Sequence, residues 1–198
     1  MTRIAVLGSG RVGGSLAKAL AQAGHEVTVA DRAPGAASAA AQAAEIVINA
    51  TPGAGSLERL TELRQELEGR ILVDVSNATV DGPDGLPTDL IHPGSSLAER
   101  LQDALPRTHV VKTLNTMLYT VMTAPAALGQ APTAFLSGED AEAKQTVSRL
   151  LGDLGWQREW ITDLGGIETA RATEAAILFV PHVMRATGFA PFAISIAR

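Results

Sequence analysis

The chain has 198 residues, of which 46% are hydrophobic and 19% charged, and these proportions are typical of a globular protein with its own core. It contains no cysteine, which excludes a disulfide scaffold, a thiolate metal site and a cysteine nucleophile. The formal net charge of -5 argues against nucleic acid as a partner, because neutralising phosphates requires a basic face.

Short apolar runs alternate with segments of helical periodicity along most of the chain. The apolar runs predict strands over residues 4–7, 26–30, 45–50, 70–75, 108–113, 133–137 and 157–161. The spacing of apolar residues predicts helices over 12–23, 57–67, 96–105, 140–154 and 167–184, with weaker helical character over 33–44 and 114–128. This alternation predicts an α/β fold built on a mainly parallel sheet.

Two segments depart from the alternation. Residues 77–94 are rich in Gly, Pro and Asp, and a loop of this length in a compact domain is usually functional or mobile. From about residue 165 the chain is more helical, so 165–198 is expected to form a helical cap that ends in a terminal strand over 191–197. Because no linker or repeat is visible, residues 1–198 are predicted to form a single domain.

No targeting or membrane segment is predicted. A core strand is expected to begin by Arg3, which leaves no room for a signal peptide before it. The apolar stretch 175–180 is too short to span a bilayer. The cytoplasm is therefore the expected location, with no membrane partner. The apolar stretch 177–183 has two open explanations, a dimer interface or packing within one chain.

The most informative motif is G-S-G-R-V-G at residues 8–13, which follows a predicted strand and opens a predicted helix. In this context Gly8 permits a tight turn, Gly10 lets a pyrophosphate approach the backbone, and Gly13 lets the helix pack closely on the strand. The helix N-terminus then offers N–H groups and a partial positive charge to the phosphates. The motif predicts a dinucleotide-binding domain; a turn that merely requires glycine is the alternative.

The residues after the second predicted strand bear on the choice of nucleotide. Asp31 lies eighteen residues beyond Gly13, where a carboxylate accepts hydrogen bonds from the adenosine ribose and repels a 2′-phosphate, which favours NAD. Arg32 follows at once, and its guanidinium could pair with a 2′-phosphate or stack on adenine. A solvated loop arginine is the other explanation for Arg32.

Small polar residues follow three further predicted strands. Thr51 and Pro52 follow the third strand, Asn77 the fourth and Asn115 the fifth. Because ligands bind beyond the carboxyl ends of parallel strands, these residues are expected to converge on the cofactor. Thr51 and Pro52 would lie near the nicotinamide ribose, and the two asparagines would orient a carboxamide or a substrate carbonyl. The alternative is an ordinary turn-capping role.

A metal site and a serine hydrolase are both disfavoured, because the four histidines lack metal-ligand spacing and Ser9 precedes no nucleophile elbow. The candidate proton donors are Lys112, Tyr119 and His92. Lys112 lies in a predicted strand and is expected to be an edge or end residue that extends to water. A proton donor with a lowered pKa is the other interpretation of Lys112.

Three runs of the sequence resemble the coenzyme F420-dependent NADP oxidoreductases: I-A-V-L-G-S-G-R-V-G at 4–13, V-V-K-T-L-N-T-M at 110–117 and F-L-S-G-E-D-A-E-A-K at 135–144. The turn at 152–156 and R-A-T-E at 171–174 fit the same family, so the resemblance extends over nearly the whole chain. It implies a Rossmann-type, doubly wound sheet with a small C-terminal helical segment, and a homodimer.

The resemblance also implies hydride exchange between a nicotinamide cofactor, NADP or NAD, and the deazaflavin coenzyme F420 stacked against it. The family's phosphate contacts correspond to Ser9, Gly10, Arg11 and Val12. The leading prediction is therefore an NAD(P)H-dependent oxidoreductase with a deazaflavin or flavin-like acceptor and no catalytic side chain assigned. The alternatives are an imine or carbonyl reductase acting on a small molecule, and a non-catalytic NAD(P)-sensing protein.

The family's 2′-phosphate pair is a Ser or Thr followed by Arg. At these positions the sequence has Asp31 and Arg32, so the arginine matches and the hydroxyl does not. The nucleotide preference, NADP or NAD, is left open by this pair.

Overall fold

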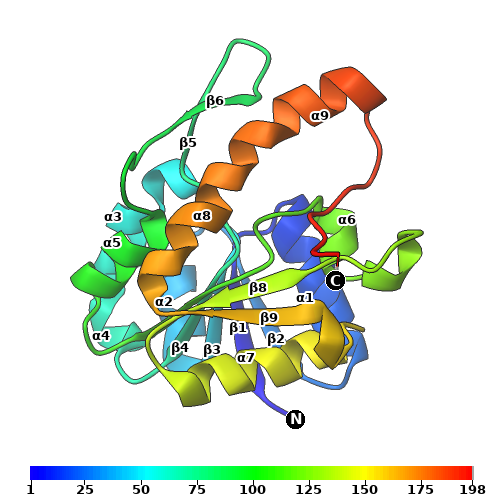
Figure 1. Ribbon diagram of the computed structural model, residues 1–198. Coiled ribbons are helices and arrows are strands. Elements are labelled where there is room, and N and C mark those ends of the chain that lie inside the picture. Colours follow the sequence, from blue (N-terminus) through cyan, green and yellow to red (C-terminus); the bar gives the residue numbers. More distant parts are fainter. Residues whose placement is uncertain (198) are drawn as a thin grey trace.

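The computed structural model describes residues 1–197, in which a seven-stranded sheet is flanked by helices on both faces (Figure 1). The strands are β1 (Arg3–Leu7), β2 (Glu26–Ala30), β3 (Ile46–Asn49), β4 (Ile71–Asp74), β5 (Thr79–Asp81), β6 (Pro87–Leu90), β7 (His109–Lys112), β8 (Ala134–Ser137) and β9 (Ile161–Gly165). The α-helices are α1 (Arg11–Gln22), α2 (Ala36–Ala43), α3 (Ser56–Glu62), α4 (Arg64–Leu67), α5 (Leu97–Ala104), α6 (Tyr119–Met122), α7 (Ala141–Asp153), α8 (Ala170–Ala175) and α9 (Val180–Thr187).

The sheet has the order β2-β1-β3-β4-β7-β8-β9. The five strands from β2 to β7 are parallel, whereas β8 pairs antiparallel with β7 and parallel with β9. The predicted α/β class with a doubly wound, mainly parallel sheet is therefore confirmed. The chain leaves β1 to form β2 on one side and then crosses back to form β3 on the other. The carboxyl ends of β1 and β3 thus flank a switch point, where α/β sheets bind ligands.

Alternate residues of the central strands fill two separate cores. On β1, Ile4 and Val6 pack with the residues of α1, α6 and α7, whereas Ala5 and Leu7 pack with those of α2 to α5 and α8. This division follows from the two-residue period of a strand that is buried on both faces. Leu20 of α1 is fully buried in the first core.

The structure corrects four of the predicted elements. The last strand begins at Ile161 rather than at 157, because Arg158–Trp160 form a 3₁₀ turn. The segment 77–94 is not an unstructured loop, since β5 and β6 form a hairpin within it. The predicted helix over 57–67 is broken into α3 and α4. The predicted terminal strand over 191–197 is absent from the described residues, where an isolated bridge joins Met117 and Ala193.

The C-terminal segment 167–197, here called the handle, leaves the sheet and returns to it. It runs from the 3₁₀ turn Ile167–Thr169 through α8, the 3₁₀ turn Ala176–Phe179 and α9 in one helical stretch that passes alongside the hairpin (Figure 1). Pro181 does not end this stretch, because it occupies the first turn of α9, where proline is tolerated. Gly188 then ends α9 with a φ of 80°.

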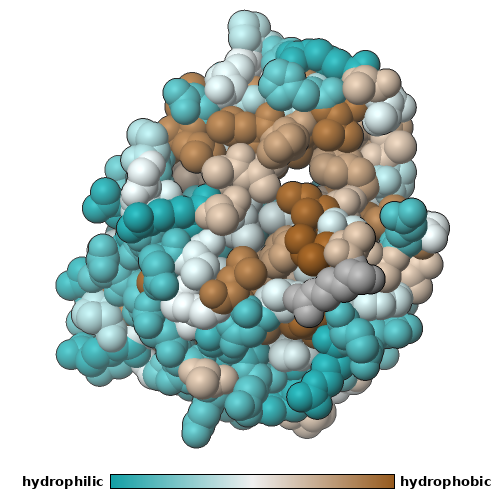
Figure 2. All heavy atoms as spheres, in the orientation of Figure 1, coloured by the Kyte–Doolittle hydropathy of each residue, from teal (hydrophilic) through white to brown (hydrophobic). Residues whose placement is uncertain are grey.

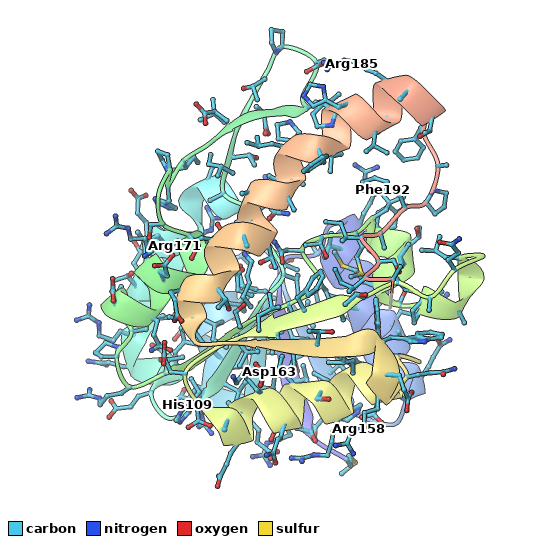
Figure 3. The ribbon with its side chains drawn as sticks, viewed as in Figure 1. His109, Arg158, Asp163, Arg171, Arg185 and Phe192 are labelled. Atoms are coloured by element: carbon cyan, nitrogen blue, oxygen red, sulfur yellow. The ribbon has the colours of Figure 1, made fainter. Side chains whose placement is uncertain are left out.

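The tail of the handle is fastened back to the body. The Leu118 N–H donates to the Phe192 carbonyl at 3.0 Å, and the Thr133 N–H donates to the Ile194 carbonyl at 2.9 Å. Phe192 lies on this returning tail (Figure 3). Figure 2 shows the face between the handle and the sheet as hollowed and surrounded by hydrophobic side chains. Across residues 1–197, no helix combines the length and apolar character needed to cross a membrane.

Candidate dinucleotide site

The glycine motif forms the turn between β1 and α1, and two of its glycines are required by contacts. Gly8 has a φ of +108°, and a Cβ there would lie 2.7 Å from the Ala50 carbonyl oxygen. A Cβ on Gly13 would lie 1.9 Å from the Gly8 carbonyl oxygen, so α1 can approach the turn only because Gly13 lacks a side chain. The turn is thereby held against the end of β3, at the switch point of the sheet.

Gly10 differs from these two glycines because nothing lies within 4 Å of the position of its Cβ. It is the N-cap of α1, and no side chain among residues 1–197 caps the helix. The N–H groups of the first turn therefore have no side-chain partner among the described residues, and they carry the partial positive charge of the helix terminus. Open space at Gly10, together with close contacts at Gly8 and Gly13, is the geometry that a bound pyrophosphate requires.

Asp31 and Arg32 follow β2 at the same edge of the sheet, and both side chains are exposed. The Asp31 carboxylate accepts a hydrogen bond from the Ala33 N–H at 2.9 Å and so closes a local turn. This structural role gives Asp31 a function that does not depend on the ribose.

At the other side of the glycine turn, the Arg11 guanidinium lies 5.6 Å from the centroid of the Tyr119 ring.

The structure brings Asn77 and Asn115 together as a pair, here called the amide pair. The Asn77 side-chain nitrogen donates to the Asn115 backbone carbonyl, the Asn115 side-chain nitrogen donates to Asn77 Oδ1, and both distances are 2.9 Å. Asn115 follows Leu114, which has a left-handed φ of 58°. This backbone conformation is rare for a bulky residue, and residues strained in this way cluster at functional sites. A Cβ on Gly53 would lie 2.1 Å from the Asn77 carbonyl oxygen, so the segment after Thr51 and Pro52 packs directly on the Asn77 backbone.

A buried polar network under this edge was not predicted. At its centre is Asn49, the last residue of β3, whose side-chain nitrogen lies 2.8 Å from Asp74 Oδ1 and 3.2 Å from Ser56 Oγ. Asn49 Oδ1 accepts a hydrogen bond from Thr51 Oγ1 at 2.6 Å. Ser76 joins the network by donating to Asp74 Oδ1 at 2.8 Å. The network fixes the loops that follow β3 and β4, because each loop is bonded to side chains of the strands beneath it.

The structure corrects the expected position of Lys112. Its side chain is 1% exposed and does not extend to water, since Nζ lies 2.8 Å from Asp74 Oδ2 and 2.9 Å from Glu174 Oε1. Nζ also donates to the Ser76 carbonyl oxygen. Burial alone would lower the pKa of Lys112, but the carboxylates of Asp74 and Glu174 outweigh it and raise the pKa. Neither of the sequence-based interpretations of Lys112 therefore holds.

Glu174 connects this lysine to the handle, and the contact was missed because the two residues lie far apart along the chain. Its carboxylate accepts hydrogen bonds from the N–H groups of Leu97 and Ala98 at 2.9 and 3.2 Å, so it also caps α5. One turn earlier, Arg171 points from α8 towards α5 (Figure 3) and donates from Nε to Glu99 at 2.8 Å. These hydrogen bonds hold the pKa of Glu99 below its usual range.

The other two candidate proton donors, Tyr119 and His92, are both half-buried. Tyr119 lies beside Arg11, and His92 follows the hairpin. Within residues 1–197, no group of three His, Asp or Glu side chains is arranged to hold a metal ion. The site thus offers backbone donors, hydroxyls and amides, which are groups that bind and orient a ligand.

Comparison with known proteins agrees with this geometry. A family model described as NADP oxidoreductase, coenzyme F420-dependent, matches residues 3–52. A crystal structure from Arthrobacter sp. FB24, provisionally named an F420-dependent NADP-reductase, is similar to the whole chain with 38% identity, a TM-score of 0.91 and 100% of both chains covered.

Two curated proteins are also similar. The chain is 29% identical over 187 residues to the uncharacterized oxidoreductase YfjR of Bacillus subtilis strain 168, covering 90% of this chain and 62% of that protein. It is 28% identical over 140 residues to the F420-dependent NADP reductase of Methanocaldococcus jannaschii, covering 69% and 60%. It therefore spans about 60% of the length of these two relatives. On its full-length similarity to the Arthrobacter protein, the chain belongs to the family of F420-dependent NADP oxidoreductases.

Proposed function

We propose that the protein is an NAD(P)H-dependent oxidoreductase that transfers hydride between a nicotinamide and a deazaflavin, coenzyme F420, or a flavin-like acceptor. The observation that carries this proposal is the open space at Gly10 in front of the α1 N-terminus, at the same sheet edge as the amide pair. We assign residues 1–198 to one dinucleotide-binding domain. The nicotinamide, when bound, supplies the hydride chemistry, and the chain supplies orientation.

The described residues suit distinct parts of such a cofactor. Backbone N–H groups of Ser9, Gly10, Arg11 and Val12 would hold the pyrophosphate, since this segment turns into the α1 N-terminus. Thr51 and Pro52 would lie at the nicotinamide ribose. The amide pair would orient the carboxamide or the carbonyl of the acceptor. Hydride transfer then requires only that two rings face each other with reacting carbons roughly 3–3.5 Å apart.

NADP(H) is the proposed nucleotide. The Asp31 carboxylate is engaged with the Ala33 N–H, whereas Arg32 is exposed and available to pair with a 2′-phosphate. We expect Arg32→Ala to weaken NADPH binding roughly 10-fold or more, the value of one charge-assisted hydrogen bond, and to leave NADH binding unchanged. Parallel fluorescence titrations of the wild type and the variant measure both affinities. An equal loss for both nucleotides would instead mean that Arg32 stacks on adenine.

The acceptor is tested on the complex saturated with NADPH. Addition of the deazaflavin is expected to cause a rapid fall of the nicotinamide absorbance, and Arg32→Ala at saturating NADPH should retain that rate. Tight NADPH binding without oxidation would reject the deazaflavin, and it would favour an imine or carbonyl reductase or a non-catalytic NAD(P) sensor. Absence of NADPH and NADH binding would contradict the whole proposal.

We also propose that the protein forms a homodimer through the handle. Phe179 and Phe189 are each 69% exposed and Ile196 is 49% exposed, and exposed apolar groups on one segment are typical of an interface. Light scattering is expected to give twice the mass of the chain. The double variant Phe179→Ser/Phe189→Ser is expected to give the monomer mass. A wild type that is monomeric at all concentrations would contradict the dimer.

A further inference from the structure

We infer that Lys112 is a positioning residue for the nicotinamide end of the cofactor site and that Glu174 of the handle is its counterion. This inference rests on the proposed function. It concerns an inaccessible side chain, which acts on the cofactor through the two asparagines and not by touching the reacting atoms.

The contacts of Lys112 join three parts of the chain. Nζ is bonded to Asp74 at the end of β4, to the Ser76 carbonyl in the following loop, and to Glu174 in α8. Asp74 and Lys112 are also register partners in the sheet. A buried cluster of two carboxylates and one ammonium is a poor way to gain stability, because apolar residues of similar volume are often as stable or more so. We therefore interpret the cluster as one that fixes the relative positions of the segments it joins.

That geometry is the placement of the amide pair. The Ser76 carbonyl that accepts from Nζ belongs to the peptide that leads into Asn77. Asn115 lies three residues beyond Lys112, across the left-handed turn at Leu114. Lys112 thus fixes the ends of β4 and β7 relative to each other, and one member of the amide pair follows each end. A change at Lys112 should move the amide pair while leaving the glycine turn at the end of β1 in place.

The competing explanation is that the cluster only fastens the handle, because Glu174 also caps α5. The two explanations differ in what they predict for two ligands. NADPH reaches both the glycine turn and the amide pair. The fragment 2′-phospho-ADP-ribose keeps both riboses but lacks the nicotinamide, so it reaches the glycine turn and the ribose position at Thr51 and Pro52 but not the amide pair. The ratio of the two affinities therefore reports on the nicotinamide end of the site. A loss of overall structure would weaken the binding of both ligands and leave that ratio unchanged.

The test variant is Lys112→Met/Glu174→Gln, which removes one charge of each sign and keeps an acceptor for the α5 N–H groups. We expect its affinity for NADPH to fall about 10-fold while its affinity for 2′-phospho-ADP-ribose stays within about 2-fold of the wild type. The matched control is Glu99→Gln, which breaks the Arg171 ion pair between the same two helices without touching Lys112. Its affinity ratio should equal that of the wild type.

Two outcomes would overturn the inference: an unchanged ratio in the double variant, whether both affinities are kept or fall equally, or the same change of ratio in the control. If the double variant does not fold, Glu174→Gln alone must change the ratio in the same direction, since it weakens the hold on Nζ and retains the side-chain oxygen. A wild type that fails to bind NADPH at all would contradict the proposed function instead. A wild type that binds both ligands equally would contradict the inference alone.

Discussion

Replacement of Gly13 by alanine is expected to abolish NADPH binding and to destabilise the protein by about 3 kcal/mol, the upper end of the usual cost of overpacking. The added Cβ would lie 1.9 Å from the Gly8 carbonyl oxygen, and a backbone atom cannot rotate away as a side chain can. Either α1 must move away from the turn or the turn must open. Thermal unfolding should show a Tm lower by roughly 10 °C, and the fluorescence titration should show no saturation.

Gly14→Ala is the matched control, one residue further along the same helix. The nearest atom to its Cβ is the Ser9 carbonyl oxygen at 3.9 Å, an ordinary van der Waals contact. Because alanine is favoured over glycine inside a helix, this variant should be more stable by about 0.5–1 kcal/mol and should bind NADPH normally. Normal folding and binding in Gly13→Ala would show that the turn does not require close packing of α1.

Gly10→Asp is expected to lose affinity as Gly13→Ala does, but with the stability of the fold preserved. Nothing lies within 4 Å of the Gly10 Cβ position, and aspartate is a favourable N-cap, so the fold should tolerate it. The new carboxylate, however, would stand where the pyrophosphate is proposed to bind and would repel it. We expect at least about a 100-fold loss of NADPH affinity, or about 2.8 kcal/mol, in the same titration.

Gly10→Asn separates the effect of charge from the effect of size, because asparagine has nearly the same shape as aspartate but carries no charge. It should lose less affinity than Gly10→Asp at low ionic strength, and the difference between them should shrink as salt is added. Unchanged NADPH affinity in Gly10→Asp would contradict the placement of the pyrophosphate at the glycine motif. The Tm of both variants checks that the fold is intact.

The central sheet could be predicted because its strands are buried on both faces and read as continuous apolar runs, as Ile4 to Leu7 shows. The strand at the edge could not be located as well. β9 includes Asp163 and Gly165, and the Asp163 carboxylate is bonded to Lys144 at 2.8 Å rather than buried. The hairpin was missed for a similar reason. β5 and β6 lack an apolar alternation, and a turn at Gly82 and Gly85 joins them.

Candidate residues of the site could be picked out of the sequence where they follow a strand, but much less easily where they belong to the strand itself. Asn77 and Asn115 were expected to converge, and the structure bonds them to each other. Asp74 and Lys112 carried a usable signal, since opposite charges occupy equivalent positions in two apolar runs of neighbouring strands. Glu174 ends the R-A-T-E run noted above, but the sequence carried no signal of its contact with Lys112, because only the tertiary path of the handle brings the two together. Its role depends on a contact between segments that sequence spacing does not relate.

The attachment of the handle at both ends restricts how it can move. At its base, Glu174 and Arg171 hold α8 against α5, and at its far end the Phe192 and Ile194 carbonyls accept hydrogen bonds from the body. Between these anchors lies the 3₁₀ turn Ala176–Phe179, and a 3₁₀ stretch within a helix is a common pivot. A segment fixed at two ends can bow at such a pivot but cannot swing away. A molecule that enters the hollow of Figure 2 therefore passes beneath a segment that is held at both ends.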